Sequence, residues 1–204
     1  MVIGGIAIIA RGVRRMTTDI DAVVQGDRID VPALLHLLSR KRIVPRIADA
    51  EVFVRESMVL LLRHEPTGVS FDVSLAWTAF EHDAIAARTN AKFGSVVAPM
   101  ARAEDLVVFK AMAARPVDIE DASALLLMYK DIDLGRVRRR LAELAALADE
   151  PLLLAGLEQV IERSMSTTPR SKTRPPKSPR TAGSAKRRPP RRTGTTTRRK
   201  RTSS

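Results

Sequence analysis

The chain has 204 residues, of which 45% are hydrophobic and 3% aromatic, a composition that suits one globular core. It contains no cysteine, which excludes disulfides, zinc–thiolate sites and thiol nucleophiles. The net charge of +12 is unevenly distributed, because residues 166–204 hold fourteen Lys and Arg and no acid, leaving 21 basic and 23 acidic residues elsewhere. We therefore expect a nearly neutral folded part and a disordered basic tail over residues 166–204.

The N-terminal part predicts two strands near a glycine pair. Val2–Ala10 reads either as a buried strand or as a strand that runs into a helix through Gly4-Gly5. This stretch is far shorter than the ~20 apolar residues of a membrane span and lacks the flanks of a signal peptide. We expect a cytoplasmic protein without membrane contact. Asp19–Val24 predicts a second strand that directs its apolar side chains toward the core (Ile20, Val23 and Val24).

The middle of the chain predicts a helix and a hairpin. Val31–Leu38 has helical apolar spacing, with Asp30 as N-cap and a proline in the first turn. The apolar runs Met58–His64 and Gly68–Leu75 are separated by a short polar turn and predict a β-hairpin. The second run carries Asp72 between two apolar neighbours, a conflict with burial that often marks a functional residue.

The pattern becomes helical after Arg102. Four segments predict helices that pack on or beside the sheet, namely Glu104–Ala114, Asp118–Tyr129, Leu134–Leu147 and Pro151–Met165. The expected fold is of the α/β (α+β) class. It has a mixed-sheet core over residues 1–100, a helical region over residues 101–165 and the basic tail.

Asp19 and Asp21 are the first candidates for chemistry. Residues i and i+2 of a strand project from the same face, so the two carboxylates approach one point. Two like charges held so close are unfavourable unless a cation lies between them. Mg²⁺ prefers oxygen ligands and is usually held by one or two carboxylates together with substrate phosphates. The spacing therefore predicts a Mg²⁺ or Mn²⁺ site.

Several motifs in order resemble those of the polymerase-β-like nucleotidyltransferase superfamily. The first part comprises Ile3-Gly4-Gly5-Ile6-Ala7, then Gly12, Arg15, Thr17 or Thr18, and Asp19-Ile20-Asp21. The apolar–acid–apolar strand Phe71-Asp72-Val73 and the run from Glu104 to Asp121 complete it. The likeness covers roughly residues 2–130 and is greatest to small AbiEii-type toxin nucleotidyltransferases. Members usually carry a helix before the first strand, whereas the strand expected here begins at Val2.

The resemblance implies a metal-dependent enzyme that uses a nucleoside triphosphate as substrate. Asp19, Asp21 and Asp72 would be the metal-binding and catalytic acids. The nucleotide would contact Gly4, Gly5, Arg15, Thr17, Lys110 and Asp118. A toxin-like member is expected beside a cognate antitoxin. The acceptor could be RNA, a protein or a small molecule, and the basic tail favours nucleic acid because its cations can neutralise phosphates.

Simpler interpretations stay open for most of these residues. Asp19 could be a turn residue, and Asp72 could lie exposed on an edge strand. Lys110 on a helix could be solvated and Arg15 could form only ion pairs. Asp118 and Asp121 could cap a helix. The tail could serve solubility alone.

Two other functions compete with the enzyme. In the first, the nucleotidyltransferase fold is retained as a catalytically silent binding module that the tail holds on nucleic acid. In the second, the tail alone does the work by binding DNA or RNA.

Overall fold

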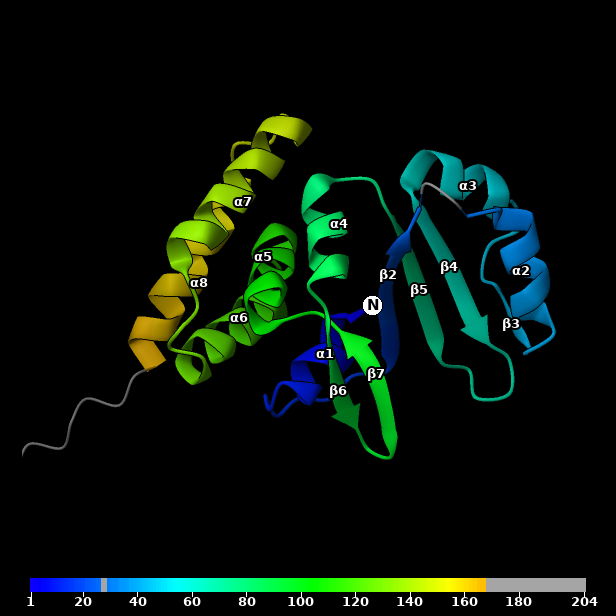
Figure 1. Cartoon of the computed structure of the whole chain (residues 1–204), viewed down its shortest axis with the longest axis horizontal. Helices are drawn as coiled ribbons and strands as arrows, with labels where there is room; N and C mark the ends of the chain where they lie inside the picture. The colour runs from blue at the N-terminus through cyan, green and yellow to red at the C-terminus, as the bar shows by residue number, and fades with distance from the viewer. Residues whose placement is uncertain (27–28, 168–204) are drawn as a thin grey trace, which may run out of the picture. The chain divides into compact units, whose positions relative to one another are not determined.

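The computed structural model describes residues 1–26 and 29–167, in which helices flank a mixed β-sheet (Figure 1). The strands are β1 (Val2–Ile3), β2 (Asp19–Gln25), β3 (Ile43–Pro45), β4 (Val59–His64), β5 (Ser70–Ala76), β6 (Thr89–Phe93) and β7 (Val96–Met100). The helices are α1 (Gly4–Ala10), α2 (Val31–Ser39), α3 (Ala50–Ser57), α4 (Ala79–Ala86), α5 (Ala103–Ala113), α6 (Pro116–Met128), α7 (Leu134–Ala148) and α8 (Leu153–Thr167). The predicted α/β class is confirmed. The basic tail from residue 168 onward lies outside the described residues.

One sheet contains the seven strands of the described part, in the order β3-β4-β5-β2-β1-β7-β6. β2 pairs in parallel with β5, and β1 pairs antiparallel with β2 and parallel with β7. The remaining neighbours are antiparallel. β2 therefore lies near the middle of the sheet, between the strand that leads into Gly4 and the strand that carries Asp72.

The two faces of the sheet bury different side chains. On one face, Leu60 and Leu62 of β4 and Val73 and Leu75 of β5 pack under α2 and α3. On the other, Val23 of β2 packs against residues of β5 and α4. Helices α5–α8 enclose the largest core together with α1, α4 and the end of β7. In Figure 1, α2 and α3 lie on one side of the strands, and α1, α4 and α5–α8 on the other.

Most predicted elements are confirmed. Val2–Ala10 is a strand that runs into a helix, because the chain turns at Gly4, whose φ is +59°. The hairpin is formed by β4 and β5. Asp30 caps α2, since its carboxylate accepts a hydrogen bond from Ala33 N at 3.0 Å. The four predicted C-terminal helices correspond to α5–α8.

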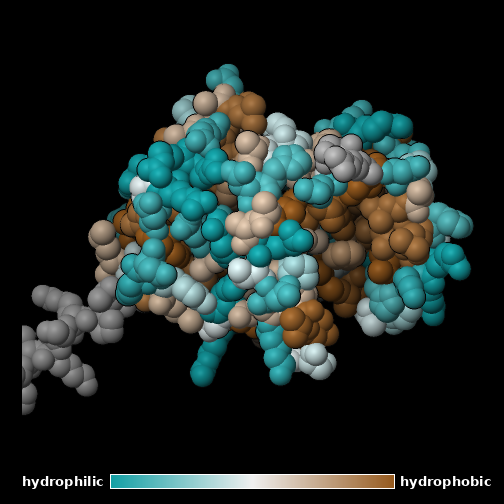
Figure 2. Space-filling model, viewed as in Figure 1, coloured by the Kyte–Doolittle hydropathy of each residue, from teal (hydrophilic) through white to brown (hydrophobic). Residues whose placement is uncertain are grey.

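Ile20, predicted to point toward the core, is only half-buried. Ile20 lines a cavity of about 390 Å³ on the sheet face that α2 and α3 cover only in part. Hydrophobic side chains gather in a hollow on this side of the molecule (Figure 2). Val23 and Val24 are held by packing, but on opposite faces of the sheet, as strand alternation requires.

Five elements were not predicted, namely β3, α3, α4, β6 and β7. Only α4 had a clear local signal. Thr78 accepts a hydrogen bond from Glu81 N at 3.2 Å while the Glu81 carboxylate accepts one from Thr78 N at 3.0 Å, a complete capping box. None of the helices in the described ranges is long and apolar enough to cross a membrane.

Candidate active site

The acidic residues of β2 and β5 share one face of the sheet. Asp19 and Asp21 are two residues apart on β2, so their side chains leave the strand in the same direction. The parallel register pairs Asp21 with Asp72 of β5, and paired residues of neighbouring strands lie about 5 Å apart. Local alternation thus aligns the first two acids, and strand pairing adds the third.

The glycine pair makes room for the side chains of this face. β1 pairs Ile3 with Asp21, which places Gly4 next to the Asp21 carboxylate. A Cβ on Gly4 would lie 1.8 Å from Asp21 Oδ2. A Cβ on Gly5 would lie 2.4 Å from Thr17 Oγ1. Real atoms do not approach so closely, so any other residue at Gly4 would displace the Asp21 carboxylate.

Burial and the neighbouring charges both act on the Asp21 carboxyl. Burial raises the pKa of the Asp21 carboxyl above its ordinary 3.8, and the negative charges of Asp19 and Asp72 raise it further. The positive charges of Lys110 and Arg115 oppose this shift of the pKa. Asp21 therefore lies where acids from two strands meet cations from the helical region.

A buried network of ion pairs adjoins the acids. Lys110 Nζ lies 2.7 Å from Asp118 Oδ1 and 3.2 Å from Asp121 Oδ2. These three side chains are 7%, 0% and 5% exposed, respectively. Arg15 pairs with Asp121, and Arg115 Nε lies 2.5 Å from Asp118 Oδ2. Lys110 is therefore not a solvated lysine, and both aspartates are occupied by cations.

Burial alone would raise the pKa of Asp118, but hydrogen bonds from Arg115 and Lys110, aided by their charges, leave this pKa below its ordinary 3.8. Neither Asp118 nor Asp121 is the N-cap of its helix, although Asp118 lies in the first turn. Helix α6 begins at Pro116, and its N-cap residue is Arg115. The helix places both acids on its buried side, where each is paired.

A cavity of about 170 Å³ joins these parts. Its wall includes Gly4 and Asp21 from the strand side and Lys110, Arg115 and Asp118 from the helical side. The side chain of Arg115 is 68% exposed, so it can reach a ligand in this space. Asp21 on one side and the exposed Arg115 on the other suit a polyphosphate that reaches the protein with a divalent cation.

The three acids do not close on a single point. Asp72 pairs with Arg46, which follows β3, and Asp19 Oδ1 accepts a hydrogen bond from Thr17 Oγ1 at 2.7 Å. In residues 1–26 and 29–167, no group of three or more His, Cys, Asp or Glu is placed to hold a metal ion. Asp19 and Asp72 are thus each held by a different neighbour.

The donor set nevertheless fits Mg²⁺. Asp19 and Asp21 offer hard carboxylate oxygens from one face, and Mg²⁺ commonly takes one or two carboxylates with the rest of its shell from water and phosphate. Gly4 supports this fit, since it leaves space for the Asp21 carboxylate against the backbone. Asp72 would join only after it leaves Arg46.

Sequence reasoning did not assign roles to Arg46 and Arg115. Arg46 follows a short strand that has no local signal, and its partner Asp72 is 26 residues away. Arg115 belongs to the Lys-x4-Arg-x2-Asp-x2-Asp run, and a functional role could have been considered from that position. Its position opposite the Asp21 carboxylate depends on how α5 and α6 pack on the sheet.

Comparison with known proteins adds no assignment. No protein-family model matches the sequence, and a search of curated proteins finds no match.

Proposed function

We propose that the protein is a metal-dependent nucleotidyltransferase. It would move a nucleoside monophosphate from a nucleoside triphosphate to an acceptor hydroxyl. The observation that carries this proposal is the register of β2 and β5, which sets Asp72 beside Asp21 on the face that also carries Asp19. Separately, the cavity between Asp21 and Arg115 supports a polyphosphate ligand.

Each residue has a role that follows from its position. Asp19 and Asp21 would hold Mg²⁺ or Mn²⁺, which when bound supplies positive charge to the phosphate oxygens. Arg115 would contact the outer phosphates from the opposite wall of the cavity. Lys110 would act mainly through its charge, since Asp118 and Asp121 hold its ammonium group.

The transfer itself requires a base. The acceptor oxygen attacks the α-phosphorus, the bond to the pyrophosphate oxygen breaks, and the proton of the acceptor hydroxyl leaves. Asp72 is the carboxylate next to Asp21 in the sheet and would accept that proton once it is free of Arg46.

The proposed acceptor is RNA. The fourteen cations of residues 166–204 would bind phosphates without sequence preference and hold an RNA near the cavity. This part of the proposal rests on the sequence of the tail. Such an enzyme would act in the cytoplasm, and a cognate antitoxin is the expected partner if it is toxin-like.

The direct test is label transfer. The purified chain is incubated with Mg²⁺, total RNA and each of the four α-³²P-labelled nucleoside triphosphates. We expect labelled RNA with the wild type and with Asp131→Asn, an exposed acid outside the site, and none with Asp19→Asn or Asp21→Asn. Absence of label in every acceptor tested, including protein, contradicts the proposal. Truncation before Ser166 should lower RNA labelling and make it less sensitive to salt.

A second candidate is the catalytically silent binding module. The ion pair between Asp72 and Arg46 favours it, because a paired carboxylate does not act as a base. Thermal stabilisation by Mg²⁺ and nucleoside triphosphate, with no product from the wild type or from Arg46→Gln, would support this module over the enzyme.

A further inference from the structure

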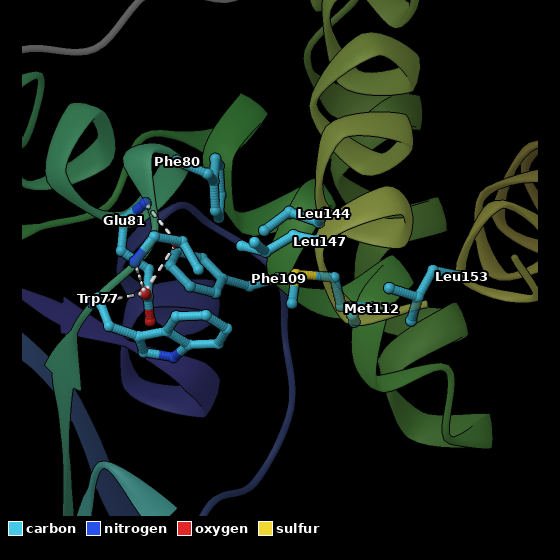
Figure 3. Close-up of a pocket in the computed structure, with 10 residues that line it drawn as sticks. Trp77, Phe80, Glu81, Phe109, Met112, Leu144, Leu147 and Leu153 are labelled. Carbon is cyan, nitrogen blue, oxygen red and sulfur yellow. Dashed lines mark hydrogen bonds between the residues drawn. The ribbon is translucent and has the colours of Figure 1, made fainter. Parts of the chain in front are cut away.

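A second cavity lies next to the candidate active site and has a different chemistry. It has a volume of about 90 Å³ and lies among α4, α5, α7 and the start of α8. Aromatic and aliphatic side chains form most of its wall, including Trp77, Phe80, Phe109, Met112, Leu144 and Leu147. In Figure 3, the side chains of Trp77, Phe80 and Phe109 point into the same space.

The two cavities adjoin each other at helix α5. Phe109 contributes to both walls. Met112 lines the apolar cavity, whereas Lys110 and Ala113 line the cavity of about 170 Å³ beside Asp21. These positions lie within about one helical turn, or roughly 5–6 Å along the axis. The cavities meet at Phe109, so a ligand with an anionic part and a flat apolar part would occupy both by passing beside this ring.

The apolar cavity has few groups that could recognise hydrogen bonds. Its polar side-chain groups are those of Thr78 and Glu81 and the indole N–H of Trp77. The Glu81 carboxylate already accepts hydrogen bonds from Trp77 N at 3.1 Å, Thr78 N at 3.0 Å and Thr78 Oγ1 at 2.8 Å. These groups serve the capping box of α4. A flat ring in this space would be held by stacking and apolar contact.

Trp77 is the only tryptophan of the chain, and its side chain is left 57% exposed at the rim. The Phe80 and Phe109 rings already pack on each other, with centroids 4.9 Å apart. An indole left open beside such a pair offers a stacking surface to a ligand. Base–aromatic stacking tolerates any base, because every base has a π-face.

We propose that this apolar cavity receives the nucleobase of the nucleoside triphosphate, with the base stacked on Trp77. The proposal rests on the nucleotidyltransferase function proposed above, which places the phosphates beside Arg115 and Asp21. Because the cavity offers mainly stacking and few hydrogen-bonding groups, the four common nucleotides bind with similar affinity. The site requires a nucleobase but does not distinguish among the four common bases.

The single tryptophan provides a readout that does not depend on catalysis. Trp77 fluorescence, excited at 295 nm, is followed while ATP, GTP, CTP or UTP is added with Mg²⁺. Magnesium tripolyphosphate serves as the ligand without a base, and N-acetyltryptophanamide corrects for absorption and collisional quenching. Calorimetry measures binding of all five ligands independently of fluorescence.

We expect saturable quenching by all four nucleotides, with dissociation constants within tenfold of one another, and none by tripolyphosphate. In calorimetry, Trp77→Ala should weaken nucleotide binding by about tenfold, equal to about 1.4 kcal/mol, and leave tripolyphosphate binding unchanged. Trp77→Phe should restore most of the affinity. Leu152→Ala, which alters a 77% exposed leucine outside the cavity wall, is the matched control and should bind as the wild type does.

The possible results test the base site separately from the proposed nucleotidyltransferase function. Calorimetric binding of nucleotides and tripolyphosphate with unchanged Trp77 fluorescence overturns the base site and leaves the phosphate site standing. Preference for one base by more than tenfold overturns the claim of indifference. Absence of binding by all five ligands overturns both proposals.

Discussion

The Lys110→Met variant tests how much the buried ion network between α5 and α6 contributes to stability. Methionine preserves most of the side-chain volume but removes the ammonium group that lies between Asp118 and Asp121. Removing one partner of a buried ion pair typically costs about 3–5 kcal/mol, because the remaining charge is left uncompensated. Here Arg115 still pairs with Asp118 and Arg15 with Asp121, so we expect the lower end, about 3 kcal/mol.

Thermal and urea unfolding measure this loss. A loss of about 3 kcal/mol corresponds to a Tm lower by about 6–12 °C for a folded part of this size. Lys130→Met is the matched control, since Lys130 is exposed, and should change stability by less than about 0.5 kcal/mol. Adding Asp118→Asn to Lys110→Met should recover part of the loss, because it removes a fully buried charge whose remaining partner is the 68% exposed Arg115. Equal Tm values for Lys110→Met and Lys130→Met would refute the reasoning.

Three further predictions concern the acidic face. Asp21→Asn should stabilise the protein at pH 7. The pKa of Asp21 is raised in the folded state, so the cost in stability of ionising this carboxyl builds up between pH 3.8 and the folded-state pKa. The gain from Asp21→Asn should therefore vanish as the pH falls to 3.8. Urea unfolding at several pH values measures this change in stability. Gly4→Ala should destabilise the protein more than Gly94→Ala. Both glycines have a φ of +59°, so alanine at either position costs about 1–2 kcal/mol in backbone strain. Only at Gly4 does the new Cβ also clash with Asp21. Equal losses of stability would show that the close approach at Gly4 is relieved at no cost. Arg46→Gln should increase the Tm gain produced by Mg²⁺, since it frees Asp72, and an unchanged gain would remove Asp72 from the metal site.

Local sequence signals located most of the elements, and their limits have physical causes. Helices α5–α8 follow from apolar periodicity, and α2 follows from its Asp30 cap and proline. The β6–β7 hairpin was missed because its strands are largely exposed and carry little apolar alternation. Helix α4 was missed although Thr78 and Glu81 carry a capping-box signal.

Some features of the candidate site follow from local sequence, and others depend on the tertiary structure. That Asp19 and Asp21 share a face needs only the alternation of one strand, and the glycine at position 4 agrees with a close backbone approach. The pairing of Asp21 with Asp72, the capture of Asp72 by Arg46 and the burial of Lys110 depend on contacts between distant segments. No local pattern encodes them.

The sequence by itself determined which residues could do the chemistry and which strand presents the first two acids, because side-chain alternation is a property of consecutive residues. Only the tertiary structure decided that Asp72 lies beside Asp21 and pairs with Arg46, that Arg115 faces Asp21 across a cavity, and where an open tryptophan lies relative to them. Strand register and helix packing set these relations, and both arise from the burial of apolar faces by segments far apart in the chain.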